Sequence, residues 1–159
     1  MKIRRIFILV HDFEERGLTM EYDKKETARK LLDDVGGTPR VYVFKDESGK
    51  EIDIFCGADS PIEHVSSYST VGLSDYTLNK KIDDKSLRAE IIGSTDSRND
   101  LFPNIISDCA FKVMDGSSPC IPGTVFLNAI DKYYLDFNMN HMLLTIPFLW
   151  ELHDLEFDH

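Results

Sequence analysis

The stretch RVYVFKDESGKEIDIF, residues 40–55, decides the fold, because it contains two β-rich runs joined by a short polar turn. The turn, Asp46-Glu47-Ser48-Gly49, has the polar and glycine content of a hairpin connection. In the second run, isoleucines alternate with Asp53 and Phe55, and successive side chains of a strand point to opposite faces. The sequence therefore predicts a β-hairpin of strands 40–45 and 51–55 with one face buried.

Further strands are expected on both sides of this hairpin. Residues 64–73, rich in Val, Tyr, Thr and Ser, predict a third strand that ends in the loop Ser74-Asp75-Tyr76. A fourth is predicted at 87–92, where Arg88 and Glu90 alternate with apolar residues. Residues 142–150 are apolar on both faces and interrupted by Pro147, which favours a buried or edge-terminating strand. Residues 124–130 fit either a strand or a helix, and residues 3–10 fit a short strand.

Two helices are predicted from apolar periodicity. Asp23 with Glu26 forms a capping box, and an apolar stripe then recurs until Gly36-Gly37 ends the helix. The second helix begins near Asn99 or Asp100, has Pro103 in its first turn and ends at Asp115. These elements predict an α+β fold, a mostly antiparallel sheet with helices packed on it.

The length of 159 residues is typical of a single domain. Residues 12–21 are polar and without period, so residues 1–22 are interpreted as an N-terminal adjunct segment and 23–159 as the domain. The sequence leaves open whether the domain lacks its C-terminal end.

The net charge of -10 is concentrated after residue 40, where nine Lys and Arg face twenty Asp and Glu. Such a field repels phosphate backbones and anionic membranes, and it speeds encounter with basic partners. Direct nucleic-acid or membrane binding is therefore not expected. The alternative is that the acidic surface only keeps the protein soluble.

The three cysteines are widely spaced, which predicts neither a disulfide framework nor a CxxC metal site, with Cys109 in the core and Cys120 exposed. The apolar run of residues 6–10 is too short for a signal-peptide core. No segment approaches the roughly 20 apolar residues of a membrane span. A reducing, cytoplasmic location is expected.

No recognisable catalytic motif is present. The five histidines form no HExxH pattern, no GxSxG surrounds a serine, and Gly36-Gly37 closes a helix where a phosphate loop would open one. No catalytic residue, metal ligand or cofactor is therefore predicted, and an enzyme is not expected. One enzymatic alternative stays open, a small metal-dependent hydrolase that uses His64 or His141 with a carboxylate such as Asp75.

Several spaced blocks carry a resemblance to a known family. They are Ser67 to Tyr76 (SYSTVGLSDY), Leu87 to Gly93, Asp100 to Ile105 (DLFPNI) and Ile146 to Glu151 (IPFLWE). In this order they resemble the suppressor-of-fused domain family, over about residues 23–157, and in particular its short bacterial antitoxin or immunity members. The resemblance implies a non-enzymatic α+β domain that binds a protein. For the bacterial members it implies binding and neutralising a cognate nuclease toxin, a basic protein, in a toxin-antitoxin system.

The candidate partner-binding residues are of two kinds. Tyr68, Asp75 and Tyr76 lie around the Gly72 turn, where tyrosine beside aspartate suits an interface anchor. The alternative is that Tyr68 packs on the sheet and Asp75 caps a turn. Acidic residues of predicted loops are candidates for pairing with toxin lysines and arginines, or else simply solvated charges: Asp46, Glu47, Asp83, Asp84 and Asp96.

A second function from the same resemblance is a regulatory scaffold. The larger family members are expected to hold an extended peptide of a partner by strand addition. The sequence does not choose between this partner and a toxin, and it indicates neither the toxin nor the oligomeric state.

Overall fold

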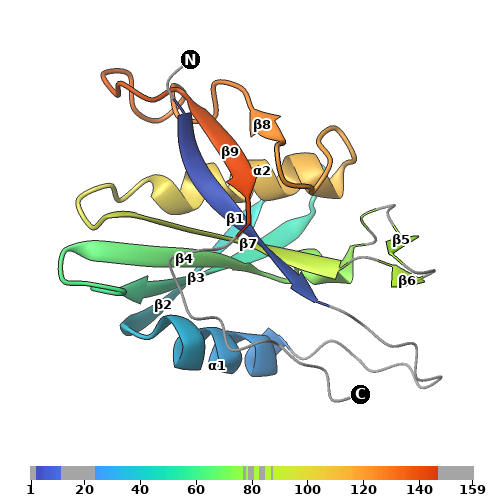
Figure 1. Cartoon of the computed structure of the whole chain (residues 1–159), viewed down its shortest axis with the longest axis horizontal. Coiled ribbons are helices and arrows are strands. Elements are labelled where there is room, and N and C mark those ends of the chain that lie inside the picture. The colour runs from blue at the N-terminus through green and yellow to red at the C-terminus, as the bar shows by residue number, and fades with distance from the viewer. Residues whose placement is uncertain are drawn as a thin grey trace.

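A twisted β-sheet with a helix on each side organises the molecule (Figure 1). The computed structural model describes residues 3–11, 24–76, 78, 81–82, 85–86 and 88–146. The elements are β1 (Ile3–His11), α1 (Lys24–Val35), β2 (Thr38–Lys45), β3 (Glu51–Ala58), β4 (Val65–Val71), the 3₁₀ helix η1 (Leu73–Asp75), β5 (Lys81–Ile82), β6 (Lys85–Ser86), β7 (Arg88–Asp96), α2 (Phe102–Met114), β8 (Val125–Phe126) and β9 (His141–Thr145).

Within these described ranges, seven strands form the main sheet in the order β2-β3-β4-β7-β1-β9-β8, and β5 pairs with β6. All pairs of the main sheet are antiparallel except β1 with β9, which is parallel. The predicted α+β class with a mostly antiparallel sheet is confirmed.

The predicted hairpin is formed by β2 and β3, with Lys45 opposite Glu51. In its turn, Asp46 Oδ1 accepts hydrogen bonds from Ser48 Oγ at 2.7 Å and from the Lys50 amide at 2.8 Å. Gly49 has a φ of 84°, a conformation that glycine adopts without steric cost. The local turn chemistry therefore accounts for this connection.

The helices cover opposite faces of the sheet, as the strand periodicity requires. Ile52 and Ile54 face α2 in the larger core, which also contains Phe102 and Ile105. Phe55, on the other face of β3, packs in a smaller cluster with residues of α1. Figure 1 shows α1 and α2 on either side of the β3, β4 and β7 strands. None of the helices in the described ranges is long and apolar enough to cross a membrane.

The N-terminal strand lies inside the sheet. Residues 7–11 of β1 pair with 88–92 of β7, and residues 3–7 pair with 141–145 of β9. The strand expected at 3–10 is thus confirmed, and it joins two parts of the sheet instead of lying beside it. Whether 1–22 and 23–159 are separate units of folding stays a prediction.

Two expectations, for β9 and for Cys120, are corrected by the structure. β9 alternates, with Met142 and Leu144 buried between half-buried neighbours, so only one face of this strand is fully buried. The residues 147–150 expected to continue it, and the capping residue Asp23, lie outside the described residues. Of the two alternatives left open for residues 124–130, the structure has a strand, the short β8, followed by turns. Cys120, expected to be exposed, is buried.

Candidate functional site

A buried carboxylate organises the segment that carried the family resemblance. Glu90 of β7 is 0% exposed. Its Oε2 accepts hydrogen bonds from Thr70 Oγ1 at 2.5 Å and the Leu73 amide at 3.2 Å. Its Oε1 accepts them from the Gly72 amide at 3.0 Å, the Ser74 amide at 3.3 Å and Ser74 Oγ at 2.8 Å. The carboxylate therefore holds the end of β4 and the whole of η1.

The surroundings of Glu90 extend this network into the sheet. Thr70 Oγ1 also accepts a hydrogen bond from the Ile91 amide at 2.8 Å, and Arg88 Nη1 donates to the Ser74 carbonyl at 2.7 Å. Gly72, with a φ of 107°, makes the turn between β4 and η1. Since its carboxylate is enclosed by donors and out of contact with solvent, Glu90 acts on the shape of the turn and not on a substrate.

Asp75 follows this turn and is exposed. Partial burial of the carboxyl raises the pKa of Asp75, and the charges of Lys24 and Arg88 oppose the rise. Lys24 Nζ lies 3.4 Å from Asp53 Oδ2, so these two acidic side chains share one lysine.

The fold brings four of the predicted contact residues to one end of the sheet. Val71 lies opposite Asp53 in the β3–β4 pair, so the turn after β4 and the β2–β3 turn leave the sheet at the same end. We call this end the hairpin-end surface and define it by four residues: Asp46, Glu47, Asp75 and Tyr76. Asp46 is partly engaged in its own turn, whose hydrogen bonds lower its pKa, whereas Glu47 is exposed.

Asp96 lies at the opposite end of the sheet, where it is paired with Val65 across β4 and β7. Its carboxylate binds Arg98 with distances of 2.8 and 2.7 Å to Nε and Nη2, which holds the pKa of Asp96 well below its usual range. His64, Asp96, Ser97 and Arg98 line a hollow there. The structure therefore does not bring Asp96 together with the hairpin-end surface.

The prediction of Tyr68 as a partner-contact residue does not fit its position in the structure. Its side chain is only 5% exposed and its ring lies 5.5 Å from that of Phe102. Strand alternation turns it toward α2 and the main core, which is the packing alternative that the sequence left open. Asp83 and Asp84 lie outside the described residues, so their role stays a prediction.

The histidines considered for a metal enzyme do not converge. His64 is exposed in the loop before β4, and His141 begins β9, where its Nδ1 accepts a hydrogen bond from the Asn128 amide at 2.8 Å. Asp75 lies at the end of the sheet opposite His64. In the part of the chain that the structure describes, no group of three or more His, Cys, Asp or Glu residues is placed to hold a metal ion.

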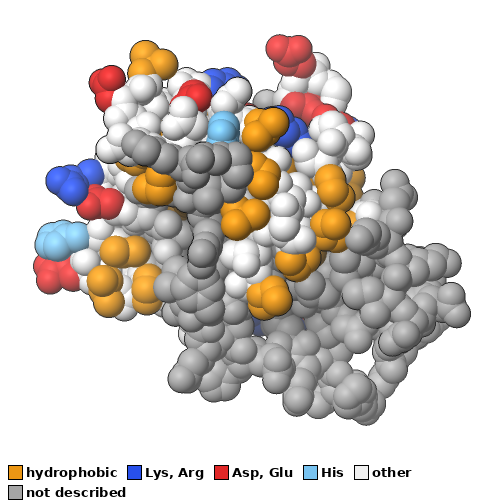
Figure 2. All heavy atoms as spheres, turned by 45° about the horizontal axis from the view of Figure 1, so that its top comes forward, with side chains coloured by type: hydrophobic (Ala, Val, Ile, Leu, Met, Phe, Trp, Pro, Cys, Tyr) orange, Lys and Arg blue, Asp and Glu red, His pale blue; other side chains and the backbone are white. Residues whose placement is uncertain are grey.

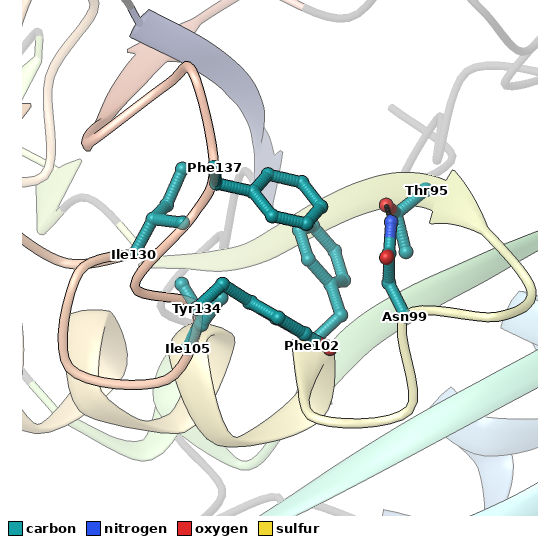
Figure 3. Close-up of a pocket in the computed structure, with 7 residues that line it drawn as sticks. All are labelled: Thr95, Asn99, Phe102, Ile105, Ile130, Tyr134 and Phe137. Atoms are coloured by element: carbon teal, nitrogen blue, oxygen red, sulfur yellow. Dashed lines mark hydrogen bonds between the residues drawn. The ribbon is translucent and has the colours of Figure 1, made fainter.

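A small cavity lies between α2 and the loop after β8 (Figure 3). Its volume is about 10 Å³, which is near the space that a single water molecule needs. Figure 3 shows aromatic rings gathered around it, and the lining residues are Thr95, Asn99, Phe102, Ile105, Ile130, Tyr134 and Phe137. A cavity of this size is a packing gap and not a substrate site.

The surface shows no single acidic field on the face seen in Figure 2. Acidic and basic side chains lie scattered toward its margins, with hydrophobic side chains between them, over the described part of that face.

Sequence reasoning missed Glu90. Alternation with Ala89 and Ile91 predicted a solvent-facing side chain, but the turn after β4 folds its amides over this carboxylate. No local pattern signals this, because the donors come from residues 16 to 20 positions away.

Comparison with known proteins gives two matches. A family model described as suppressor of fused protein matches residues 48–159, which include η1 and Glu90. The chain is 39% identical over 141 residues to a Bacillus subtilis (strain 168) protein named Immunity protein YqcF. That alignment covers 88% of this chain and 72% of the Bacillus protein. No solved structure matches the chain.

Proposed function

The chain belongs to the suppressor of fused protein family, and on that premise we propose that it is an immunity protein that binds and neutralises a cognate protein toxin. The observation that carries this proposal is the 39% identity to a protein named as an immunity protein, which extends over 88% of the chain. An alignment of this length extends over most of the chain and not over one isolated motif.

The toxin that fits this chain best is a basic nuclease. A nuclease must attract phosphate, so its active-site face is positively charged, and a protein of net charge -10 complements it. Neutralisation then requires only that the inhibitor cover this face, with no turnover of any substrate. We place the encounter in the cytoplasm, which is compatible with three free and buried cysteines.

The hairpin-end surface is the region that we propose for toxin contact. It combines the exposed carboxylates of Glu47 and Asp75 with the half-buried Tyr76. Carboxylates at a rim pair with lysine and arginine, and a tyrosine beside them adds apolar area at low entropic cost.

The test is co-expression with candidate nuclease toxins from the same genome, with cell survival and recovery of the complex as readouts. We expect rescue, and a complex that weakens as salt rises from low to moderate concentration. Reversal of the two exposed carboxylates, Glu47→Arg with Asp75→Arg, should abolish rescue. Asp96→Arg, at the opposite end of the sheet, is the matched charge control and should leave rescue intact.

The converse result, loss of rescue only with Asp96→Arg, would move the contact region to the other end of the sheet. Absence of both rescue and complex, with the protein folded, would overturn the immunity function.

One observation favours the second candidate, a scaffold that binds an extended peptide. Among the strands that the structure describes, β2 lies at the edge of the sheet, and its Val41 and Val43 are each 59% exposed. An open edge with apolar side chains can accept a further strand. Val41→Lys with Val43→Lys should weaken peptide binding on this edge, whereas toxin binding at the hairpin-end surface should not change.

A further inference from the structure

The turn that presents Asp75 and Tyr76 owes its shape to a residue distant in sequence. We propose that Glu90 is a positioning residue for toxin binding, whose buried carboxylate holds residues 72–76 in the form in which Asp75 accepts a Lys or Arg side chain of the toxin. This inference rests on the proposed immunity function and adds to it a buried determinant of the contact surface.

The Glu90 carboxylate leaves the turn little conformational freedom. Three consecutive amides, those of Gly72, Leu73 and Ser74, all donate to the same carboxylate at 3.0 to 3.3 Å. Hydrogen bonds to a charged acceptor are about twice as strong as neutral ones. A buried amide without an acceptor is costly, so any other conformation of the turn is disfavoured.

Neighbouring elements also restrict the turn from outside. A Cβ at position 72 would lie 3.2 Å from Lys24 Cε, and Arg88 Nη1 binds the Ser74 carbonyl at 2.7 Å. Lys24 and Arg88 are also the two cations whose charges act on Asp75. Contacts from α1 and β7 thus restrict the turn, and charges on the same two elements act on the Asp75 carboxylate.

The order of this turn in the free protein favours binding. A flexible loop must be ordered when a partner binds, and the lost conformational entropy reduces affinity. A turn that is already ordered avoids this loss. This turn presents one acidic side chain beside one tyrosine. Such a surface fits a cationic side chain on a partner protein and not an anionic ligand.

The experiment uses Glu90→Gln, which keeps the side-chain shape but removes the charge and one acceptor oxygen. Amide hydrogen exchange measures how often the turn opens. Titration with an inactivated form of the toxin that the co-expression test identifies measures affinity, at a temperature where every variant is folded. The control is Ser67→Ala, which removes the buried hydroxyl that donates to the Ser60 carbonyl at 2.7 Å, at the other end of β4.

We expect Glu90→Gln to speed exchange of the amides of residues 72–74 by about tenfold or more, with the β2–β3 ladder unchanged. We expect its dissociation constant for the toxin to rise by about tenfold. Ser67→Ala should change neither. Should Glu90→Gln fail to fold, Ser74→Ala, which removes one donor at 2.8 Å, should show smaller effects in the same direction.

Two results would overturn the inference, and they are distinguishable from failure of the proposed function. The first is a dissociation constant of Glu90→Gln within roughly twofold of that of the wild type, although the amides of the turn exchange faster. That result would mean that the order of the turn does not affect toxin binding. The second is an equal loss of affinity in Ser67→Ala, which assigns the effect to general destabilisation. By contrast, a wild-type protein that binds no toxin refutes the immunity function, and the inference falls with it.

Discussion

Replacing Glu90 with alanine tests how much the buried carboxylate contributes to stability. Three buried amides, at residues 72–74, would lose their acceptor, and each unsatisfied donor costs about 1–3 kcal/mol. The hydroxyls of Thr70 and Ser74 can rotate to other acceptors, and removal of the charge returns its desolvation cost. Three such donors together would cost about 3–9 kcal/mol. We therefore expect a loss near the low end of that range, about 3–5 kcal/mol, which is also typical of breaking a buried charged pair.

The assay is equilibrium unfolding in urea, followed by circular dichroism. A typical domain has a free energy of unfolding of about 5–15 kcal/mol, so a loss of this size is a large fraction of the total. The denaturant slope should stay the same, since the fold still buries the same surface. Ser67→Ala is the control and should cost about 1 kcal/mol. A loss for Glu90→Ala no larger than that of the control would refute the view that the carboxylate holds the turn.

Three further predictions concern other parts of the molecule. Burial raises the pKa of Asp75 in the folded protein, so ionisation of this carboxyl as pH rises lowers the free energy of unfolding. Asp75→Asn should therefore raise the thermal midpoint at pH 7. This gain should vanish at a pH where the wild-type carboxyl is protonated. Burial raises the pKa of the Cys120 thiol to about 12, so native protein at pH 8 should resist alkylation at this cysteine, and labelling should appear only with unfolding; rapid labelling of folded protein would contradict this burial. Tyr134→Phe removes the acceptor of the Leu101 amide at the start of α2, a 2.8 Å bond, and should cost about 0.5–1.5 kcal/mol in urea unfolding; no measurable change would mean that solvent replaces it.

Much of the secondary structure was predictable because its causes are local. The β2–β3 hairpin depends on alternation within each strand and on its turn. In that turn the Asp46 side chain accepts a hydrogen bond from the Lys50 amide, and Gly49 adopts a positive φ. Helix α1 ends where Gly36 adopts a φ of 73° and donates to the Leu32 carbonyl. The apolar stripe of α2 likewise marks its buried side. In each case the residues involved are near neighbours in the chain.

The sequence identified residues of the candidate site but not their common location. Asp75 and Tyr76 were identified beside the Gly72 turn, and Asp46 and Glu47 in a hairpin turn, but nothing in the sequence indicated that these turns leave the sheet at the same end. That follows from the pairing of β3 with β4. The same pairing rules separate Asp96 from them and turn Tyr68 into the core.

The sequence by itself determined the α+β class, the hairpin, both helices and the family to which the chain belongs, because patterning and motif order are properties of neighbouring residues. Only the tertiary structure decided that β1 joins β7 to a parallel β9, and that Glu90 is buried beneath the amides of a turn about 16 residues earlier in the chain. The physical reason is that a hydrogen bond between distant segments depends on their approach in space. A charged carboxylate in a strand pattern predicts an exposed side chain, because the hydrogen-bond donors that allow its burial come from elsewhere in the fold.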